Sequence, residues 1–172
     1  MSKARVLLVF IVLMGCLAVA PAHAASGDAK TLLRGFEEVP AIAAPGNAHF
    51  IANIGPGDVI QYTLSYTPLS TPITQSHIHF STRGVNGGIV VFLCSNLGNG
   101  PAGTQACPAA PATITGTITA NNVLGVPAQG FQPGSFAELV QAIQAGAAYV
   151  NIHTTAFPGG EVRGQLVFTP TP

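Results

Sequence analysis

Two short segments of this chain carry the residues best suited to bind a metal ion. In the first, Ser76-His77-Ile78-His79-Phe80, a single apolar residue separates two histidines. Side chains alternate along a strand and the rise is about 3.3 Å per residue, so the two Cα atoms lie roughly 6.6 Å apart with both imidazoles on one face. Ile78 points the other way, into a core. This spacing lets two imidazoles approach one ion.

The second segment runs from Tyr149 to His153 and follows the same alternation. Its two aliphatic residues take the buried face, so Asn151 and His153 share the polar face with Tyr149. If this strand lies near the first, its histidine completes a set of three imidazoles, which suits copper or zinc better than the hard cations. The alternative is that the histidines only hydrogen-bond to neighbouring strands and loops.

Glu161 and Arg163 lie two residues apart on a further predicted strand and share one face. Together with Asn151 they are candidates to support the metal ligands as second-shell groups. For the two charged residues, a structural ion pair is the alternative interpretation.

Catalytic chemistry has little support in the sequence, and we assign no catalytic residue. Ser76 lies beside the histidines, but no Gly-x-Ser-x-Gly motif is present and no Asp is evident to orient a base. Glu37 and Glu38 are adjacent, so on a strand they would point apart and could not work as a glycosidase pair.

The composition favours one secreted β domain. Of the 172 residues, 48% are hydrophobic and only 7% are charged, which is enough for a real core but leaves a surface of uncharged polar residues. No basic patch is available to neutralise phosphates, so we expect no nucleic-acid partner.

The N-terminus has the features of an export signal. Lys3 and Arg5 precede an apolar run over residues 6–13, and small residues follow at 22–24. We therefore predict that residues 1–24 are a signal peptide and that residues 25–172 form a single domain, secreted or periplasmic. The alternative is a lipoprotein signal ending at Cys16, which would anchor the chain by a lipid. No other stretch approaches the ~20 apolar residues of a membrane span.

Alternation and turn residues predict about eight strands. They are expected near residues 31–36, 48–54, 59–67, 76–80, 89–94, 112–119, 149–153 and 161–168. The turn Gly55-Pro56-Gly57-Asp58 should join the second and third strands in a hairpin. His49, alone on the second strand, is interpreted as structural. The pattern indicates an all-β fold, an antiparallel immunoglobulin-like β-sandwich or barrel.

One helix is expected at about residues 135–145. Ser135 and Glu138 have the spacing of a capping box, and Gly146 is placed to end the helix. Four apolar residues fall at helical spacing on one face: Phe136, Leu139, Val140 and Ile143.

Cys94 and Cys107 remain after signal cleavage. In an exported protein they are expected to form a disulfide, closing a ring of about 14 residues worth roughly 3 kcal/mol. Their spacing fits no zinc pattern.

Four motifs together resemble the CHRD domain, which is named for chordin, the animal inhibitor of bone morphogenetic proteins, and occurs widely in exported bacterial proteins. The resemblance covers about residues 31–168. The motifs are Glu37-Glu38-Val39-Pro40, Ser76-His77-Ile78-His79, the helix start at residues 135–139 followed by residues 148–154, and residues 158–166.

The resemblance implies an immunoglobulin-like β-barrel remotely similar to copper/zinc superoxide dismutase. By that likeness His77, His79 and His153 correspond to copper ligands. The chain departs from the enzyme in having no histidine placed to bridge copper to zinc, because His49 precedes the His-x-His strand. Dismutation is therefore not expected from the resemblance alone.

The leading hypothesis is an exported, non-enzymatic CHRD module that binds or scaffolds an extracellular or periplasmic partner and holds copper or zinc on three histidines. The alternative is a copper-dependent redox enzyme of the superoxide-dismutase type, which would need an open coordination position and a substrate route. We expect metal affinity to fall below about pH 6, because bound imidazole must be neutral and free imidazole titrates near 6.5.

The signal peptide and the two remaining cysteines predict the covalent state of the exported protein. Its intact mass should show loss of residues 1–24 and of two hydrogens. Free thiols at both Cys94 and Cys107 would contradict the disulfide, and a diacylglyceryl group on Cys16 would establish the lipoprotein alternative.

Overall fold

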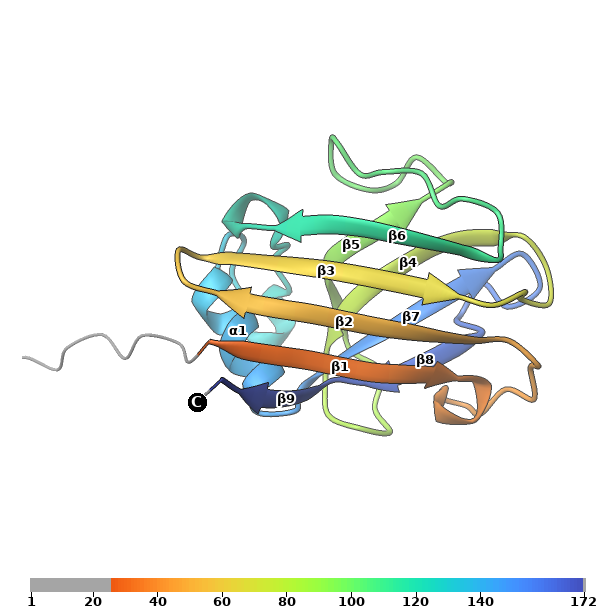
Figure 1. Ribbon diagram of the computed structural model, residues 1–172, viewed down its shortest axis with the longest axis horizontal. Coiled ribbons are helices and arrows are strands. Elements are labelled where there is room, and N and C mark those ends of the chain that lie inside the picture. Colours follow the sequence, from red (N-terminus) through yellow and green to blue (C-terminus); the bar gives the residue numbers. More distant parts are fainter. Residues whose placement is uncertain (1–25, 172) are drawn as a thin grey trace, which may run out of the picture.

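The computed structural model describes residues 26–171 and shows one antiparallel sheet curled into a nearly closed barrel (Figure 1). The sheet order is β5-β4-β7-β8-β1-β2-β3-β6, and β9 pairs with β1. The strands are β1 (Gly27–Arg34), β2 (Asn47–Gly55), β3 (Val59–Tyr66), β4 (Ile73–Phe80), β5 (Gly88–Ser95), β6 (Ala112–Ile118), β7 (Ala148–Thr154), β8 (Val162–Gln165) and β9 (Val167–Pro170). The predicted all-β fold with one helix is confirmed.

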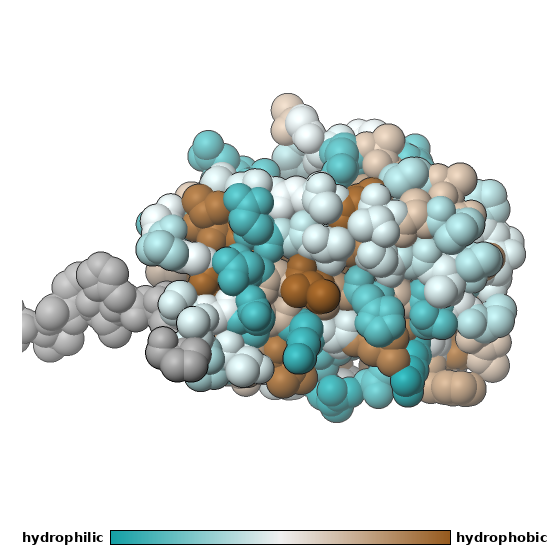
Figure 2. Space-filling model, in the orientation of Figure 1, coloured by the Kyte–Doolittle hydropathy of each residue, from teal (hydrophilic) through white to brown (hydrophobic). Residues whose placement is uncertain are grey.

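The barrel has two walls with the core between them. Figure 1 shows β1, β2, β3 and β6 in front and β4, β5, β7 and β8 behind. Along β2 and β3 buried and exposed residues alternate, as expected for a wall with one solvated face. The solvated front is accordingly mostly pale or teal in Figure 2. In contrast, every residue of β7 is buried, because β7 lies between β4 and β8 and is covered on both faces.

The predicted hairpin between β2 and β3 is confirmed. Gly55 pairs with Val59, and Ile54 with Ile60. Gly57 and Asp58 take left-handed backbone angles in the turn, with φ of 86° and 55°, a conformation that Gly and Asp tolerate better than other residues.

The predicted helix is confirmed as α1 (Phe136–Gln144), and the four predicted apolar residues are all buried. Its C-terminus is a Schellman motif: Gly146, with φ of 66°, donates to the carbonyl of Ile143, and Ala147 donates to that of Ala142. The capping box is wrong, because the side chain of Ser135 makes no capping hydrogen bond.

Three of the expected strands differ clearly from their expected bounds, and the first of them, β4, begins at Ile73 instead of near residue 76. β1 begins at Gly27 and ends at Arg34, before a 3₁₀ turn, η1 (Gly35–Glu37). The last predicted strand, 161–168, divides at Leu166 into β8 and β9, since Leu166 donates to the carbonyl of Ala148 while β9 pairs with β1. The barrel therefore has nine strands rather than eight.

The predicted disulfide joins Cys94 to Cys107, whose Cα atoms lie 5.1 Å apart. It ties the end of β5 to the loop that follows. The predicted signal peptide and Cys16 lie outside the described residues. Within residues 26–171, no helix has the length and apolar character needed to cross a membrane.

Replacing Leu139 with Ala should lower the free energy of unfolding by roughly 2–5 kcal/mol, because this fully buried side chain would leave a cavity. The exposed Gln141 on the same helix is the matched control, and Gln141→Ala should change stability by less than about 0.5 kcal/mol. Chemical denaturation of both variants measures the difference. Equal effects would mean that α1 does not contribute this face to the core.

Candidate metal centre

The register between β4 and β7 brings the three predicted histidines together. His77 pairs with Asn151, His79 with Tyr149, and Gln75 with His153. Paired residues point to the same side of a sheet, so His77 and His79 share one face with Asn151 and His153. One ligand nitrogen from each of the three histidines lies within 4.8 Å of the others.

Backbone carbonyls fix the orientation of two of the rings. His79 Nδ1 lies 2.9 Å from the carbonyl of Gly87, and His153 Nδ1 lies 2.8 Å from that of Pro158. Each Nδ1–H must donate there, which leaves the Nε2 lone pair of each neutral ring facing the cluster. Metal-bound histidines are held by the same kind of contact.

The third ring completes the arrangement. His77 Nδ1 lies 3.2 Å from His153 Nε2, and because the latter is an acceptor, His77 must donate this hydrogen bond. His77 Nε2 is then a buried lone pair without a partner in the described part of the chain. An unsatisfied acceptor of this kind is uncommon in a folded protein, and it can take up the proton if that proton leaves Nδ1.

The spacing of these nitrogens suits a metal ion. Two nitrogens bound tetrahedrally to one ion at about 2.0–2.1 Å lie about 3.3 Å apart, close to the 3.2 Å between His77 Nδ1 and His153 Nε2. His77 can bind an ion through Nδ1 when its proton moves to Nε2. The widest separation, 4.8 Å, exceeds the roughly 4.1 Å that two such bonds can span. Binding therefore requires a small rotation of one ring.

Burial keeps the imidazoles neutral. The exposed fractions of His77, His79 and His153 are 0%, 7% and 7%. This face was expected to be polar, and instead the loops carrying Gly87 and Pro158 cover it. Desolvation lowers the pKa of His77 to about 2 and that of His79 to about 4, and it also lowers the pKa of His153. Three neutral rings are ready to act as ligands without losing a proton.

A stack of flat groups supports His79 from behind. The Tyr149 ring is parallel to the His79 ring at a centroid distance of 4.6 Å. The Arg163 guanidinium lies 3.4 Å from the centre of the Tyr149 ring, and it donates to Asn86 Oδ1 and to the carbonyl of Val85. Arg163 thus reaches the candidate site through Tyr149 and does not touch the histidines.

The other two predicted supporting residues have different positions. Asn151 contacts the site directly, since its Oδ1 lies 3.0 Å from His79 Nε2. A half-turn of the amide would present its NH₂ group to that lone pair. Glu161 is buried away from the rings and accepts hydrogen bonds from the Ser70 amide at 2.8 Å and the Thr154 hydroxyl at 2.7 Å. Among the described residues, Glu161 and Arg163 form no ion pair.

Sequence reasoning missed Glu38 and the role of Tyr149. Glu38 is buried, its Oε1 has no hydrogen-bond partner in the described residues, and desolvation raises its pKa to about 7 against the opposing charge of Arg163. Glu37, its neighbour, is exposed and paired with Arg83. No local pattern distinguishes the two carboxylates, because the covering loops alone decide which is buried.

Comparison with protein-family models matches the CHRD domain over residues 29–166. No curated protein and no solved structure matches the chain.

The lowered histidine pKa values predict that the metal-free protein loses stability in acid. Unfolded imidazoles bind protons below pH 6.5, whereas folded His79 and His77 do so only near 4 and 2. The unfolded state alone is therefore protonated in this interval, so the contribution of these histidines to the free energy of unfolding is fully present above pH 6.5 and is lost as pH decreases towards 4. Urea denaturation with a chelator present measures this profile.

The Glu38→Gln variant provides the control. Burial raises the pKa of Glu38 to about 7 in the folded protein, compared with 4.5 for an ordinary glutamate in the unfolded chain. Protonation of Glu38 therefore stabilises the fold as pH decreases from 7 to 4.5. Because glutamine cannot be protonated in this way, the free energy of unfolding of Glu38→Gln should decrease more steeply with falling pH than that of the unaltered protein. A profile that stays flat from pH 7 to 4 in this variant would contradict the burial of neutral histidines.

Proposed function

Because this chain belongs to the CHRD domain family, we propose that it is an exported, non-enzymatic binding or scaffolding module whose three-histidine cluster holds a copper or zinc ion. The observation that carries the proposal is the convergence of three imidazole nitrogens on one covered face. The barrel supplies the rigid frame, and its outer surfaces and loops are left for a partner.

The donor set supports copper or zinc. The cluster offers three neutral nitrogen ligands, which copper and zinc accept, and no carboxylate of the kind that calcium and magnesium require. A bound ion would supply coordinate bonds that link β4 to β7, and the proton that lies between His77 and His153 would move to His77 Nε2, so that the ring stays neutral. The carbonyls of Gly87 and Pro158 hold the rings in orientation, and Asn151 contacts His79 at the edge of the cluster.

The burial of the cluster favours a module over a redox enzyme. A redox enzyme of the superoxide-dismutase type would need a substrate to reach the ion, but the three rings expose at most 7% of their surface. The copper-dependent redox alternative therefore has less support than a resident ion in a binding module.

Metal binding is tested by calorimetric titration of the metal-free protein with Cu(II) and with Zn(II). One ion should bind per chain, and His79→Gln should weaken binding by more than about 100-fold, because loss of a supporting contact alone costs 10–100-fold. His49→Gln is the matched control, since His49 is exposed on β2 outside the cluster. Equal affinity in both variants would show that the cluster is structural.

The pH dependence of binding should follow the buried rings and not free imidazole. Because His79 and His77 are neutral down to about pH 4 and 2, affinity should change little between pH 7 and 5. This replaces the sequence-based expectation of a fall below pH 6. Superoxide consumption by the copper-loaded protein, if it were lost in His79→Gln, would overturn the non-enzymatic assignment and establish the redox alternative.

A further inference from the structure

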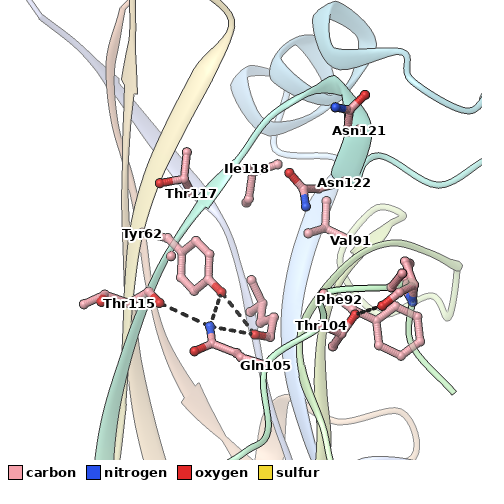
Figure 3. A pocket seen from close by; sticks show the side chains of 15 residues that line it. Tyr62, Val91, Phe92, Thr104, Gln105, Thr115, Thr117, Ile118, Asn121 and Asn122 are labelled. Atoms are coloured by element: carbon pink, nitrogen blue, oxygen red, sulfur yellow. Dashed lines mark hydrogen bonds between the residues drawn. The ribbon is translucent and has the colours of Figure 1, made fainter. Parts of the chain in front are cut away.

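The barrel is open between β5 and β6, the two ends of the sheet order. A cavity of about 260 Å³ lies in this opening (Figure 3). Its walls are residues 91–93 of β5, residues 115–118 of β6, and the loop over residues 101–105, and no charged residue lines it. An occupant must therefore be uncharged where it enters the opening.

The alternation of hydrogen bonds shows which backbone groups of β6 face the opening. Beyond the end of β3, the amide of Thr67 donates to the carbonyl of Asn47, at the continuation of the β2–β3 register. The odd-numbered residues of β3, like Thr67, therefore form their backbone hydrogen bonds with β2. The even-numbered residues, such as Tyr62, form theirs with β6. Tyr62 pairs with Gly116, so the flanking residues Thr115 and Thr117 direct their N–H and C=O groups away from β3. The N–H and C=O groups of Thr113, two residues before Thr115 on the same strand, also point away from β3.

The opposite edge, on β5, is largely covered. The carbonyl of Val90 accepts from the Leu124 amide at 2.8 Å, and the amide of Ser95 donates to the Gln105 carbonyl at 2.9 Å. The carbonyl of Leu93 accepts from the Tyr62 hydroxyl at 3.1 Å. β6, in contrast, pairs with no described strand other than β3. The edge available for a further strand is therefore that of β6.

The side-chain amide of Gln105 lies between β5 and β6, at the position that a peptide group of an added strand would occupy. Gln105 Nε2 lies 3.1 Å from the carbonyl of Thr115 on β6 and 3.1 Å from that of Leu93 on β5. Figure 3 shows this amide spanning the opening between the two walls. A single amide therefore bridges the gap, so the opening has the width of one inserted chain and is too narrow for a second folded sheet.

We propose that the outer edge of β6, residues 113–117, is a docking site for an uncharged, extended segment of a partner protein, which adds to the barrel as a further strand. Addition to an exposed edge obtains its affinity from main-chain hydrogen bonds. Two hydroxyl groups of the cavity are already engaged: the Tyr62 hydroxyl bonds to Leu93, and that of Thr117 donates to Gln61 Oε1. Apart from the Thr115 carbonyl, which accepts from Gln105 Nε2, the outward backbone groups of β6 have no strand partner in the described part of the chain, which favours a peptide over a small polyol.

The sequence of β6 lacks the devices that normally protect an edge strand. Natural edges carry lysine, proline or inward-pointing charges that prevent pairing. β6 is Ala-Thr-Ile-Thr-Gly-Thr-Ile, with Thr113, Thr115 and Thr117 exposed and no charge along its length. Two buried isoleucines fix its register, so the edge is presented in a single alignment.

The probe for this site is an acetylated and amidated hexapeptide of alternating Thr and Val, compared with the same peptide methylated at every backbone nitrogen. Hydrogen exchange followed by NMR reports on single amides of the intact domain. The first peptide should slow exchange at Thr113, Thr115 and Thr117 by about tenfold or more, because these N–H groups become hydrogen-bonded. Ile114 and Gly116, already bonded to β3, should change little. The methylated peptide should have no effect.

Two variants with opposite expected effects refine the test. Thr115→Pro removes one outward N–H without removing a bond to β3 and should weaken peptide binding at least about tenfold, whereas Thr115→Val, which keeps the N–H, should not. Gln105→Ala removes the amide that occupies the edge and should strengthen binding roughly five- to tenfold, the equivalent of one hydrogen bond. Thermal unfolding checks that each variant is folded.

Three results would overturn the proposal. The first is absence of protection at the three threonine amides, and the second is equal protection by the methylated peptide. The third is a concentration-dependent dimer that protects these amides without peptide and is lost in Thr115→Pro, since the occupant would then be a second copy of this chain. The peptide comparison remains decisive if Thr115→Pro fails to fold. Metal content does not enter the test, so its outcome is independent of the three-histidine site.

Discussion

The covered polar face of β4, β7 and β8 is the constraint on which the rest of this structure depends. A sheet face that carries histidine, asparagine and arginine would normally be left to solvent, but here loops close over it. Each polar group must therefore find a partner inside the protein, because a buried group without one costs about 1–3 kcal/mol. The carbonyls of Gly87 and Pro158 meet this demand for two imidazoles, and the Tyr149 ring meets it in part for Arg163. His77 Nε2, Gln165 Oε1 and Glu38 Oε1 are left without a hydrogen-bond partner among the described residues.

The same face explains why the loops have the conformations they do. The loop between β4 and β5 contacts His79 through Gly87 and Arg163 through Val85 and Asn86. Gly160, with φ of 129°, lies against the carboxylate of Glu38, where any side chain would collide with it. The cluster thus lies between β4, β7 and the two loops that carry Gly87 and Pro158.

The candidate metal centre and the opening beside β6 are neighbours through one residue. Phe92 of β5 lies edge-on to His77, with ring centroids 4.4 Å apart, and it also lines the cavity between β5 and β6. Gly116 makes the opening possible from the other wall, because a side chain there would occupy the position of the Tyr62 ring. The two sites use opposite sides of β5, one through its pairing with β4 and one through its outer edge.

The sequence by itself determined the features that depend on local periodicity and turn chemistry. The alternation in β2 and β3, the turn at Gly57 and Asp58, the apolar face of α1 and its stop at Gly146 all agree with the structure, since each follows from a few consecutive residues. The set of three histidines was also found, because alternation on a strand decides which side chains share a face.

The tertiary structure alone decided the rest. Covering loops turned a polar face into a buried one and made Glu38 rather than Glu37 the buried carboxylate. The register of β4 on β7 set the distances between the rings, and the order of the strands left β6 at an edge. These outcomes depend on contacts between segments far apart in the chain, which no local pattern encodes.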